Sequence, residues 1–175
     1  MTRDQWQKNL EKAAGYGRFD KNYEKLEQLG KGKFSTVFKC RHKKKDRVYA
    51  LKEITKANLD PREMKFIRDE IQIFALVAHP NAARMLEVFE NQKYILIVMD
   101  FVDGGELFEF ILKQDRMSAQ EVTRMLFHIL EVIQYMKIAS IVHRDLKPEN
   151  ILVTREDKMI KIIDFGLSKI LIPGT

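Results

Sequence analysis

The spacing of apolar residues changes once along this chain, and the change limits the folds that the chain can adopt. Residues 23–54 hold short runs rich in Val, Phe and Tyr that are separated by turn residues, and two more strand-like runs cover 84–90 and 93–100. A helix is expected between these two groups of strands. After residue 105 the apolar residues recur mainly at helical spacing. The pattern predicts an α+β fold with a boundary near 99–105.

Local signals predict the limits of the individual strands and helices. Asp60 can cap a helix that starts at Pro61, and Glu63 completes the capping box, so we expect a helix to about Ala78. A second capping box at Ser118 leads a long helix. The other expected elements are strands at about 23–31, 34–42 and 47–54, a short helix from Gly104-Gly105 to near Lys113, and a hairpin of 151–153 with 159–163. The apolar face expected on the long helix comprises Val122, Met125, Leu126, Ile129, Ile133 and Met136.

Composition excludes several classes of protein. With 175 residues, of which 45% are hydrophobic and 32% charged, the chain is neither disordered nor collagen-like and can bury a core. Its longest apolar runs, such as 94–99, are too short to span a bilayer, so we expect no transmembrane segment. The single cysteine, Cys40, cannot form an internal disulfide. We therefore expect a reducing, cytoplasmic setting.

The net charge of +6 raises the hypothesis of a nucleic-acid or lipid partner. Much of the excess is local, because eight Lys and Arg residues lie between Lys39 and Lys56 against only Asp46 and Glu53. The densest part, 43–47, falls between two predicted strands. An exposed hairpin turn explains it better than a binding site, and we expect no nucleic-acid partner.

A glycine-bearing turn joins the first two predicted strands, in the run Leu29-Gly-Lys-Gly-Lys-Phe-Ser-Thr-Val37. Glycines at such a turn let main-chain N–H groups approach phosphate oxygens. A strand follows rather than a helix, which excludes a Rossmann fingerprint, and the Gly-Lys-Ser/Thr ending of a Walker loop is missing. Alone, the turn is better explained by an ordinary hairpin.

Lys52 and Glu70 form the second candidate constellation. Lys52 lies in a predicted strand among apolar neighbours, where a lysine is usually a surface residue. Glu70 lies at the centre of an apolar helical stripe, and a buried glutamate needs a cationic partner to offset its desolvation. We expect Lys52 to be that partner, in a pair that could hold the lysine amine against two phosphates.

The strongest signal is the polar run 141–150, Ile-Val-His-Arg-Asp-Leu-Lys-Pro-Glu-Asn, followed by Asp164-Phe165-Gly166. Carboxylates and an amide oxygen suit Mg²⁺, which prefers hard oxygen ligands and keeps phosphate partners. A further aspartate can orient a hydroxyl nucleophile, and a neighbouring lysine can neutralise charge on a transferring phosphoryl group. The run therefore points to phosphoryl transfer.

With these motifs in this order, residues 23–175 resemble the eukaryotic protein kinase family. The resemblance implies a bilobal fold, with a small antiparallel β-sheet lobe containing one helix and the first part of a mainly helical large lobe. It implies ATP and Mg²⁺ as cofactors. It places a small lobe at 23–99, a hinge at 100–105 and a partial large lobe at 106–175, after an N-terminal extension (1–22) with a helix at about 2–14.

The resemblance also assigns roles to individual residues. Asp145 would be the catalytic base and Lys147 its cationic neighbour, while Asn150 and Asp164 would bind Mg²⁺. Lys52, paired with Glu70, would hold the α- and β-phosphates. The remaining nucleotide contacts would come from Leu29, Gly30, Gly32, Val37, Ala50, Asp100, Val102, Glu106 and Leu152. An apolar spine is implied for Phe74, Met85, His143 and Phe165.

Finer features of the resemblance concern the substrate. Lys147 is similar to the serine/threonine branch, and the sequence most resembles the calcium/calmodulin-dependent kinase group. Glu106 and Glu149 match positions that favour arginine upstream of the phosphorylated residue, so the expected partner is a protein Ser/Thr substrate with upstream arginine. Ser35, in place of the third glycine of the nucleotide turn, is a small departure.

The end of the sequence is the larger departure. The chain stops at Thr175, before most of the activation segment, its Ala-Pro-Glu anchor and the remaining large-lobe helices. We therefore expect an exposed apolar face on the long helix. The alternative to an active kinase is a truncated, catalytically incompetent fragment that binds a nucleotide or a protein partner.

Overall fold

The computed structural model describes residues 18–57 and 59–171, which form two compact units. The first unit contains the described residues up to Met64 together with Met85–Phe101, and the second contains Lys65–Arg84 and the residues from Val102 onward. The helix expected at 2–14 lies outside the described residues. The lobe limits expected from the sequence stay predictions.

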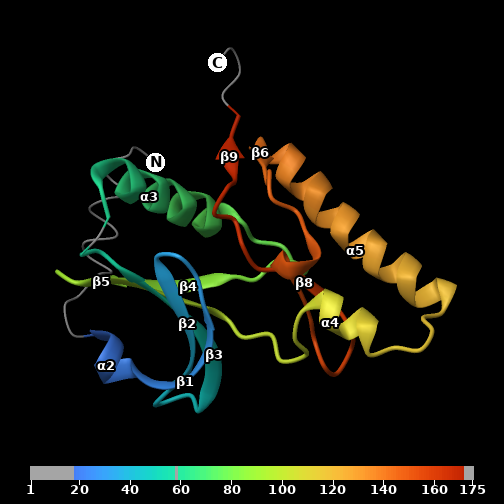
Figure 1. Cartoon of the computed structure of the whole chain (residues 1–175), viewed down its shortest axis with the longest axis horizontal. Coiled ribbons are helices and arrows are strands. Elements are labelled where there is room, and N and C mark those ends of the chain that lie inside the picture. The colour runs from blue at the N-terminus through green and yellow to red at the C-terminus, as the bar shows by residue number, and fades with distance from the viewer. Residues whose placement is uncertain (1–17, 58, 172–175) are drawn as a thin grey trace. The chain divides into compact units, whose positions relative to one another are not determined.

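The first unit is built on a five-stranded antiparallel sheet (Figure 1). Its strands are β1 (Tyr23–Lys31), β2 (Ser35–His42), β3 (Arg47–Thr55), β4 (Met85–Glu90) and β5 (Tyr94–Asp100). They pair in the order β1-β2-β3-β5-β4. Each strand matches its predicted range to within one residue at either end, because turn residues and apolar alternation mark the limits on the sequence itself.

An aromatic cluster fills one part of the core of this unit. The short helix α2 (Arg18–Asn22), which the sequence did not predict, contributes Phe19, whose ring stacks on Tyr23 with 5.5 Å between centroids. The Tyr23 hydroxyl donates a 2.8 Å hydrogen bond to Glu87. Cys40 is fully buried in the same cluster, and burial raises the pKa of its thiol to about 11. At about pH 7 this thiol is protonated and poorly reactive.

The helix α3 (Pro61–Leu76) begins where the sequence predicted. The Asp60 carboxylate accepts hydrogen bonds from the main-chain N–H groups of Arg62 and Glu63 at 2.7 and 2.8 Å. In return, Glu63 accepts one from the main chain of Asp60 at 3.1 Å. The reciprocal bonds of this capping box explain why a local sequence pattern located the helix start correctly.

The second unit combines helices with two small ladders (Figure 1). Its elements after α3 are α4 (Leu107–Leu112), α5 (Ala119–Ile138), β6 (Ile141–Val142), the 3₁₀ turn η1 (Pro148–Asn150), β7 (Ile151–Val153), β8 (Ile160–Ile162) and β9 (Lys169–Ile170). The hairpin of β7 and β8 was predicted. The antiparallel pair of β6 and β9 was not, because two-residue strands carry no periodicity.

The apolar face predicted on the helix α5 is partly buried and partly exposed. Met125, Val132 and Met136 are buried, whereas Leu126 is 54% exposed and Leu130 is 61% exposed. Two more members of the predicted face, Val122 and Ile133, are also exposed. The exposed apolar face expected on this helix is therefore present.

Within residues 18–57 and 59–171, no helix combines the length and apolar character that crossing a bilayer requires.

Candidate active site

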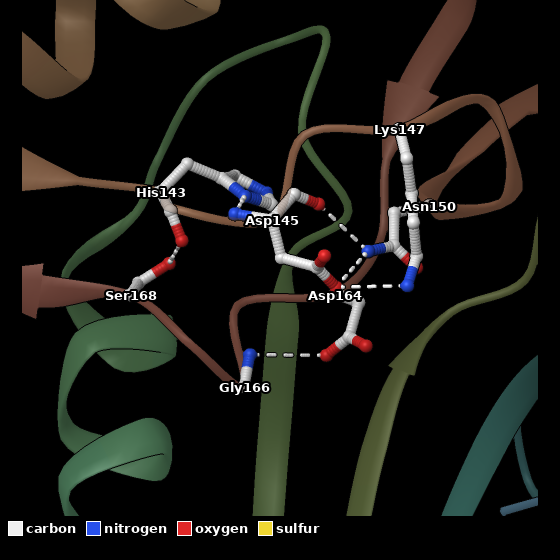
Figure 2. A network of polar contacts seen from close by, with 7 residues as sticks. All are labelled: His143, Asp145, Lys147, Asn150, Asp164, Gly166 and Ser168. Atoms are coloured by element: carbon white, nitrogen blue, oxygen red, sulfur yellow. Dashed lines mark hydrogen bonds and ion pairs between the residues drawn. The ribbon is translucent and has the colours of Figure 1, made fainter.

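The polar loop between β6 and β7 brings three of the predicted site residues together (Figure 2). The Asn150 side-chain amide donates to the main-chain carbonyl of Asp145 at 2.9 Å and to its carboxylate Oδ2 at 3.0 Å. The Lys147 ammonium lies 3.1 Å from the same Oδ2 atom. Asp145 is thus held from two sides, by an amide and by a cation.

The backbone of the loop explains why these side chains converge. Pro148 starts the 3₁₀ turn η1, and its N-terminal neighbour Lys147 accepts a 3.0 Å hydrogen bond from the main chain of Asn150. The carbonyl of Asn150 then accepts from Ile163 N at 3.0 Å, which ties the turn to the end of β8. Arg144 adopts φ 65°, a left-handed conformation that reverses the chain just before Asp145.

The charges in the loop shift each other's pKa values. The hydrogen bond from Lys147 is the largest cause that lowers the pKa of Asp145, and the bond from Asn150 lowers it further. The same pair raises the pKa of Lys147. Asp145 is therefore ionised and Lys147 protonated at about pH 7. An ionised, oriented carboxylate is the state that can accept a proton from a hydroxyl group.

A stack of rings lies behind the loop. Phe165 is 1% exposed, and its ring centroid lies 5.4 Å from that of Phe74 on α3 and 5.4 Å from that of His143. Burial lowers the pKa of His143, and its Nδ1 atom accepts a 3.3 Å hydrogen bond from the main chain of Asp145. The contacts expected among Phe74, His143 and Phe165 are confirmed, while the place of Met85 in the spine stays a prediction.

Asp164 follows β8 and begins the turn that ends at Gly166 (Figure 2). Its Oδ1 atom accepts a 3.0 Å hydrogen bond from the main chain of Gly166. A Cβ atom placed on Gly166 would lie 3.2 Å from that oxygen and 3.5 Å from Oε2 of Glu70. The carboxylates of Asp164 and Glu70 therefore both lie next to this glycine.

The donor set fits a magnesium ion. The Nδ2 amide of Asn150 is engaged with Asp145, so its Oδ1 oxygen is the atom that can bind a cation, and Asp164 supplies carboxylate oxygen. Among the described residues no cluster of three or more His, Cys, Asp or Glu side chains could hold a metal by itself. Two protein ligands suffice for Mg²⁺, which takes its other ligands from water and phosphate.

The predicted residues of the first unit lie on four of its strands and on the turn between β1 and β2. Lys52 lies on β3, where its register partners are Val37 on β2 and Ile97 on β5. Leu29 and Gly30 are in β1, and Gly32 N donates a 2.7 Å bond to Ser35 O, which closes the turn. The pairing of Lys52 with Glu70 stays a prediction. Ala50 is also on β3, and Asp100 is the last residue of β5.

The remaining predicted nucleotide contacts lie in the second unit. Val102 is buried and Glu106 is exposed, and Glu106 forms an isolated antiparallel bridge with Leu152 on β7. Sequence reasoning assigned no role to Asp103, Gly104 or Arg155, although the structure ties all three to this segment. The Gly104-Gly105 pair was noted only as a helix start. A glycine that is not needed for a turn is the signal that could have identified a close main-chain contact.

Comparisons with known proteins agree with this geometry. The protein kinase domain family matches residues 23–175. The chain is 38% identical over 153 residues to the human serine/threonine-protein kinase DCLK3, covering 86% of this chain and 24% of that protein. It is also 38% identical to calcium-dependent protein kinase 4 of Plasmodium falciparum over 154 residues, covering 86% of this chain and 29% of that protein.

A third relative, the calcium/calmodulin-dependent protein kinase type II of Caenorhabditis elegans, is 38% identical over 153 residues, which are 86% of this chain and 21% of that protein. The chain thus spans less than a third of the length of each of these three relatives. The family match extends across both units and includes the loop at Asp145 and the turn at Asp164. Residues 23–175 therefore belong to the protein kinase family.

Proposed function

We propose that this chain carries the nucleotide-binding and catalytic-loop residues of a serine/threonine protein kinase that transfers the γ-phosphate of ATP to a protein hydroxyl. The observation that carries the proposal is the double hydrogen bond from Asn150 to Asp145, with Lys147 on the same carboxylate. These contacts orient an ionised carboxylate and leave the Asn150 amide oxygen for a cation. Family membership and serine/threonine kinase relatives support the reaction class.

Each residue has a defined part in this reaction. Asp145 accepts the proton of the substrate hydroxyl as the hydroxyl oxygen attacks the γ-phosphorus, while the bond from that phosphorus to the β,γ-bridging oxygen breaks and ADP leaves. Lys147 offsets negative charge on the phosphoryl oxygens. Asn150 and Asp164 hold Mg²⁺, which when bound neutralises phosphate charge. Lys52 holds the α- and β-phosphates. The backbone at Gly30 and Gly32 covers the phosphates, and Leu29, Val37, Ala50 and Leu152 contact the base.

We further propose a basic substrate preference and an intracellular setting. Glu106 and Glu149 are both exposed, and Glu149 is close enough to Lys147 for its charge to raise the pKa of that lysine. Two exposed carboxylates near the catalytic loop would attract arginine side chains of a substrate. The protonated, buried thiol of Cys40 fits a compartment in which cysteines stay reduced.

The direct test is transfer of radiolabelled phosphate from Mg·ATP to peptides. A peptide with arginine upstream of its serine should be phosphorylated faster than the same peptide with alanine there. Asp145→Asn should reduce transfer by about 10²- to 10⁴-fold, since a general base typically contributes that much. Lys169→Met, on the exposed strand β9, is the matched control and should leave transfer unchanged. Equal rates for the two peptides would refute the basic preference alone.

One observation favours a second candidate function, that of a fragment that binds nucleotide or partner without transferring phosphate. Apolar side chains on α4 and α5 are exposed, among them Phe108 at 51% and Phe127 at 58%. Exposed apolar surface of this kind marks an interaction face. Binding of Mg·ATP with no measurable phosphate transfer would support this candidate over the first.

A further inference from the structure

The segment from Val102 to Glu106 lies against β7 through contacts that the proposed chemistry leaves unexplained. The main-chain N–H of Val153 donates a 2.9 Å hydrogen bond to the carbonyl of Gly105. Glu106 and Leu152, which are one residue further along the first segment and one residue back along β7, form an antiparallel bridge. These contacts set which residue of the segment faces which residue of β7.

Asp103 and Arg155 join the two segments at one end of this contact, opposite to the end formed by Glu106 and Leu152. The Asp103 carboxylate accepts a 3.0 Å hydrogen bond from the main-chain N–H of Arg155. The Arg155 guanidinium reaches back and donates to the main-chain carbonyl of Asp103 at 3.4 Å. Because the bonds run in both directions, each residue limits the sliding of the other along the strand.

Gly104 makes the close approach possible. A Cβ atom on this residue would overlap the carbonyl oxygen of Val153 and lie 2.9 Å from the carbonyl carbons of Val153 and Thr154. All of these are main-chain atoms, so no side-chain rotation could relieve the contact. The neighbouring Gly105 differs, because open space surrounds its Cα and it is required instead for its φ of 85°.

Glu106 occupies a position that suits recognition better than local structure. It is the N-cap residue of α4, with φ −69° and ψ 143°, yet within the described part of the chain its side chain makes no capping hydrogen bond. Serine, threonine, aspartate or asparagine would cap the helix better. Its side chain is exposed, and its main chain pairs with that of Leu152 across the bridge.

We propose that Asp103, Gly104 and Arg155 are positioning residues that fix the segment 102–106 in register with β7. In this register the main chains of Glu106 and Leu152 are fixed opposite each other. That sets the place of the Glu106 side chain, which the family resemblance implies for the ribose, relative to Leu152, which it implies for the base. The inference rests on the proposed function, because it concerns the same nucleotide. It adds the device that couples ribose recognition to base recognition.

The test measures equilibrium binding of the whole chain to Mg·ATP and to Mg·2′,3′-dideoxy-ATP, so that catalytic activity is not needed. Wild type should bind ATP about tenfold more tightly, as expected for one hydrogen bond to a charged group. Gly104→Ala should reduce the ratio of the two affinities, that for Mg·ATP over that for the dideoxy nucleotide, towards one. Val132→Ala, which removes a fully buried side chain of α5 far along the chain, is the stability control and should keep the wild-type ratio.

A milder pair of variants covers the case in which Gly104→Ala does not fold. Asp103→Ala removes the acceptor of the Arg155 N–H and should also reduce the ratio, whereas Asp103→Asn keeps an oxygen acceptor and should restore it. A wild-type ratio in both Gly104→Ala and Asp103→Ala would overturn the inference, as would a wild-type chain that binds both nucleotides equally. Failure of wild type to bind Mg·ATP at all would instead refute the proposed function.

Discussion

The side-chain amide of Asn150 donates to two oxygens of Asp145, the main-chain carbonyl at 2.9 Å and the carboxylate Oδ2 at 3.0 Å. One buried residue thereby fixes both the backbone and the side chain of the proposed catalytic base. The amide leaves its own oxygen for another ligand, so the positions of the base and of a cation ligand are not independent. A substitution at Asn150 should disturb structure and chemistry together.

Asn150→Ala should lower the free energy of unfolding by about 1–3 kcal/mol, because two acceptors of Asp145 lose their buried donor. Urea denaturation measures the change, and the denaturant dependence should stay constant. Asn150→Asp, which is matched in size, should instead raise the pKa of Asp145 by placing a like charge beside it. Gln92→Ala, at an exposed turn, is the control and should stay within about 0.5 kcal/mol of wild type. Wild-type stability of Asn150→Ala would contradict the prediction.

Lys147→Met should change how stability depends on pH. Lys147 is the main cause of the lowered pKa of Asp145. A carboxyl group whose pKa is lower in the folded state than in the unfolded chain stabilises the fold at pH values above its unfolded pKa. That contribution is complete above about pH 3.9 and is lost as the pH falls through the lower folded pKa. The stability difference between wild type and Lys147→Met should therefore be largest near neutral pH and shrink in acid.

Unfolding in urea at a series of pH values measures this difference, and NMR titration of the Asp145 carboxyl measures its pKa directly. Lys169→Met removes a cation from exposed β9 and serves as the control. An unchanged Asp145 titration in Lys147→Met would show that the ion pair does not form in solution.

The parts of the fold that the sequence predicted are those that depend on local bonds. The capping boxes at Asp60 and Ser118 are reciprocal hydrogen bonds between residues three apart, and both helices begin as expected. The strands of the sheet were found because apolar alternation and turn residues lie within each strand. The pairing of β6 with β9 depends on residues 28 or so apart, in strands of two residues, and no local pattern reports it.

In the candidate site too, contacts between residues close in the sequence were predictable and contacts between distant segments were not. Asp145, Lys147 and Asn150 lie within six residues of one another, and their convergence follows from the turn that joins them. The tight contact of Gly104 with Val153 involves segments far apart in the sequence, so the presence of the glycine did not predict which residue it contacts. Spacing predicted the apolar face of α5 but not which of its members are buried, because packing against other segments separates buried Met125 from exposed Leu126.

Phe165→Ala should cost about 3–5 kcal/mol of stability, since the ring is fully buried between Phe74 and His143. Water entering the space would relieve the burial that lowers the pKa of His143, so this pKa should rise towards its usual value. Thermal unfolding and NMR titration measure the two effects. If Phe165→Ala does not fold, Phe165→Leu should show smaller shifts in the same directions. Phe108→Ala, at an exposed ring, should change neither quantity.

Substitutions at Ser118 and Glu121 should separate two contributions of the capping box on α5 to stability, that of the helix cap and that of the ionised Glu121 carboxylate. Ser118→Ala removes the side-chain cap and should cost about 1 kcal/mol. The pKa of Glu121 is lowered to about 2, first by the main-chain N–H of Ser118, then by Lys158 and then by the Ser118 hydroxyl, and the first two partners remain in that variant. Ser118→Ala should therefore keep most of the acid dependence of stability.

Glu121→Gln should remove that acid dependence. With a lowered folded pKa, Glu121 stabilises the fold above about pH 4.3, its ordinary value, and the contribution is lost as the pH falls through about 2. The stability difference between wild type and Glu121→Gln should thus narrow between these two pH values, whereas the difference for Ser118→Ala should stay nearly constant. Gln120→Ala, exposed in the first turn of α5, is the control. Parallel pH profiles for Glu121→Gln and wild type would mean that the carboxylate contributes no more in the folded state than in the unfolded chain.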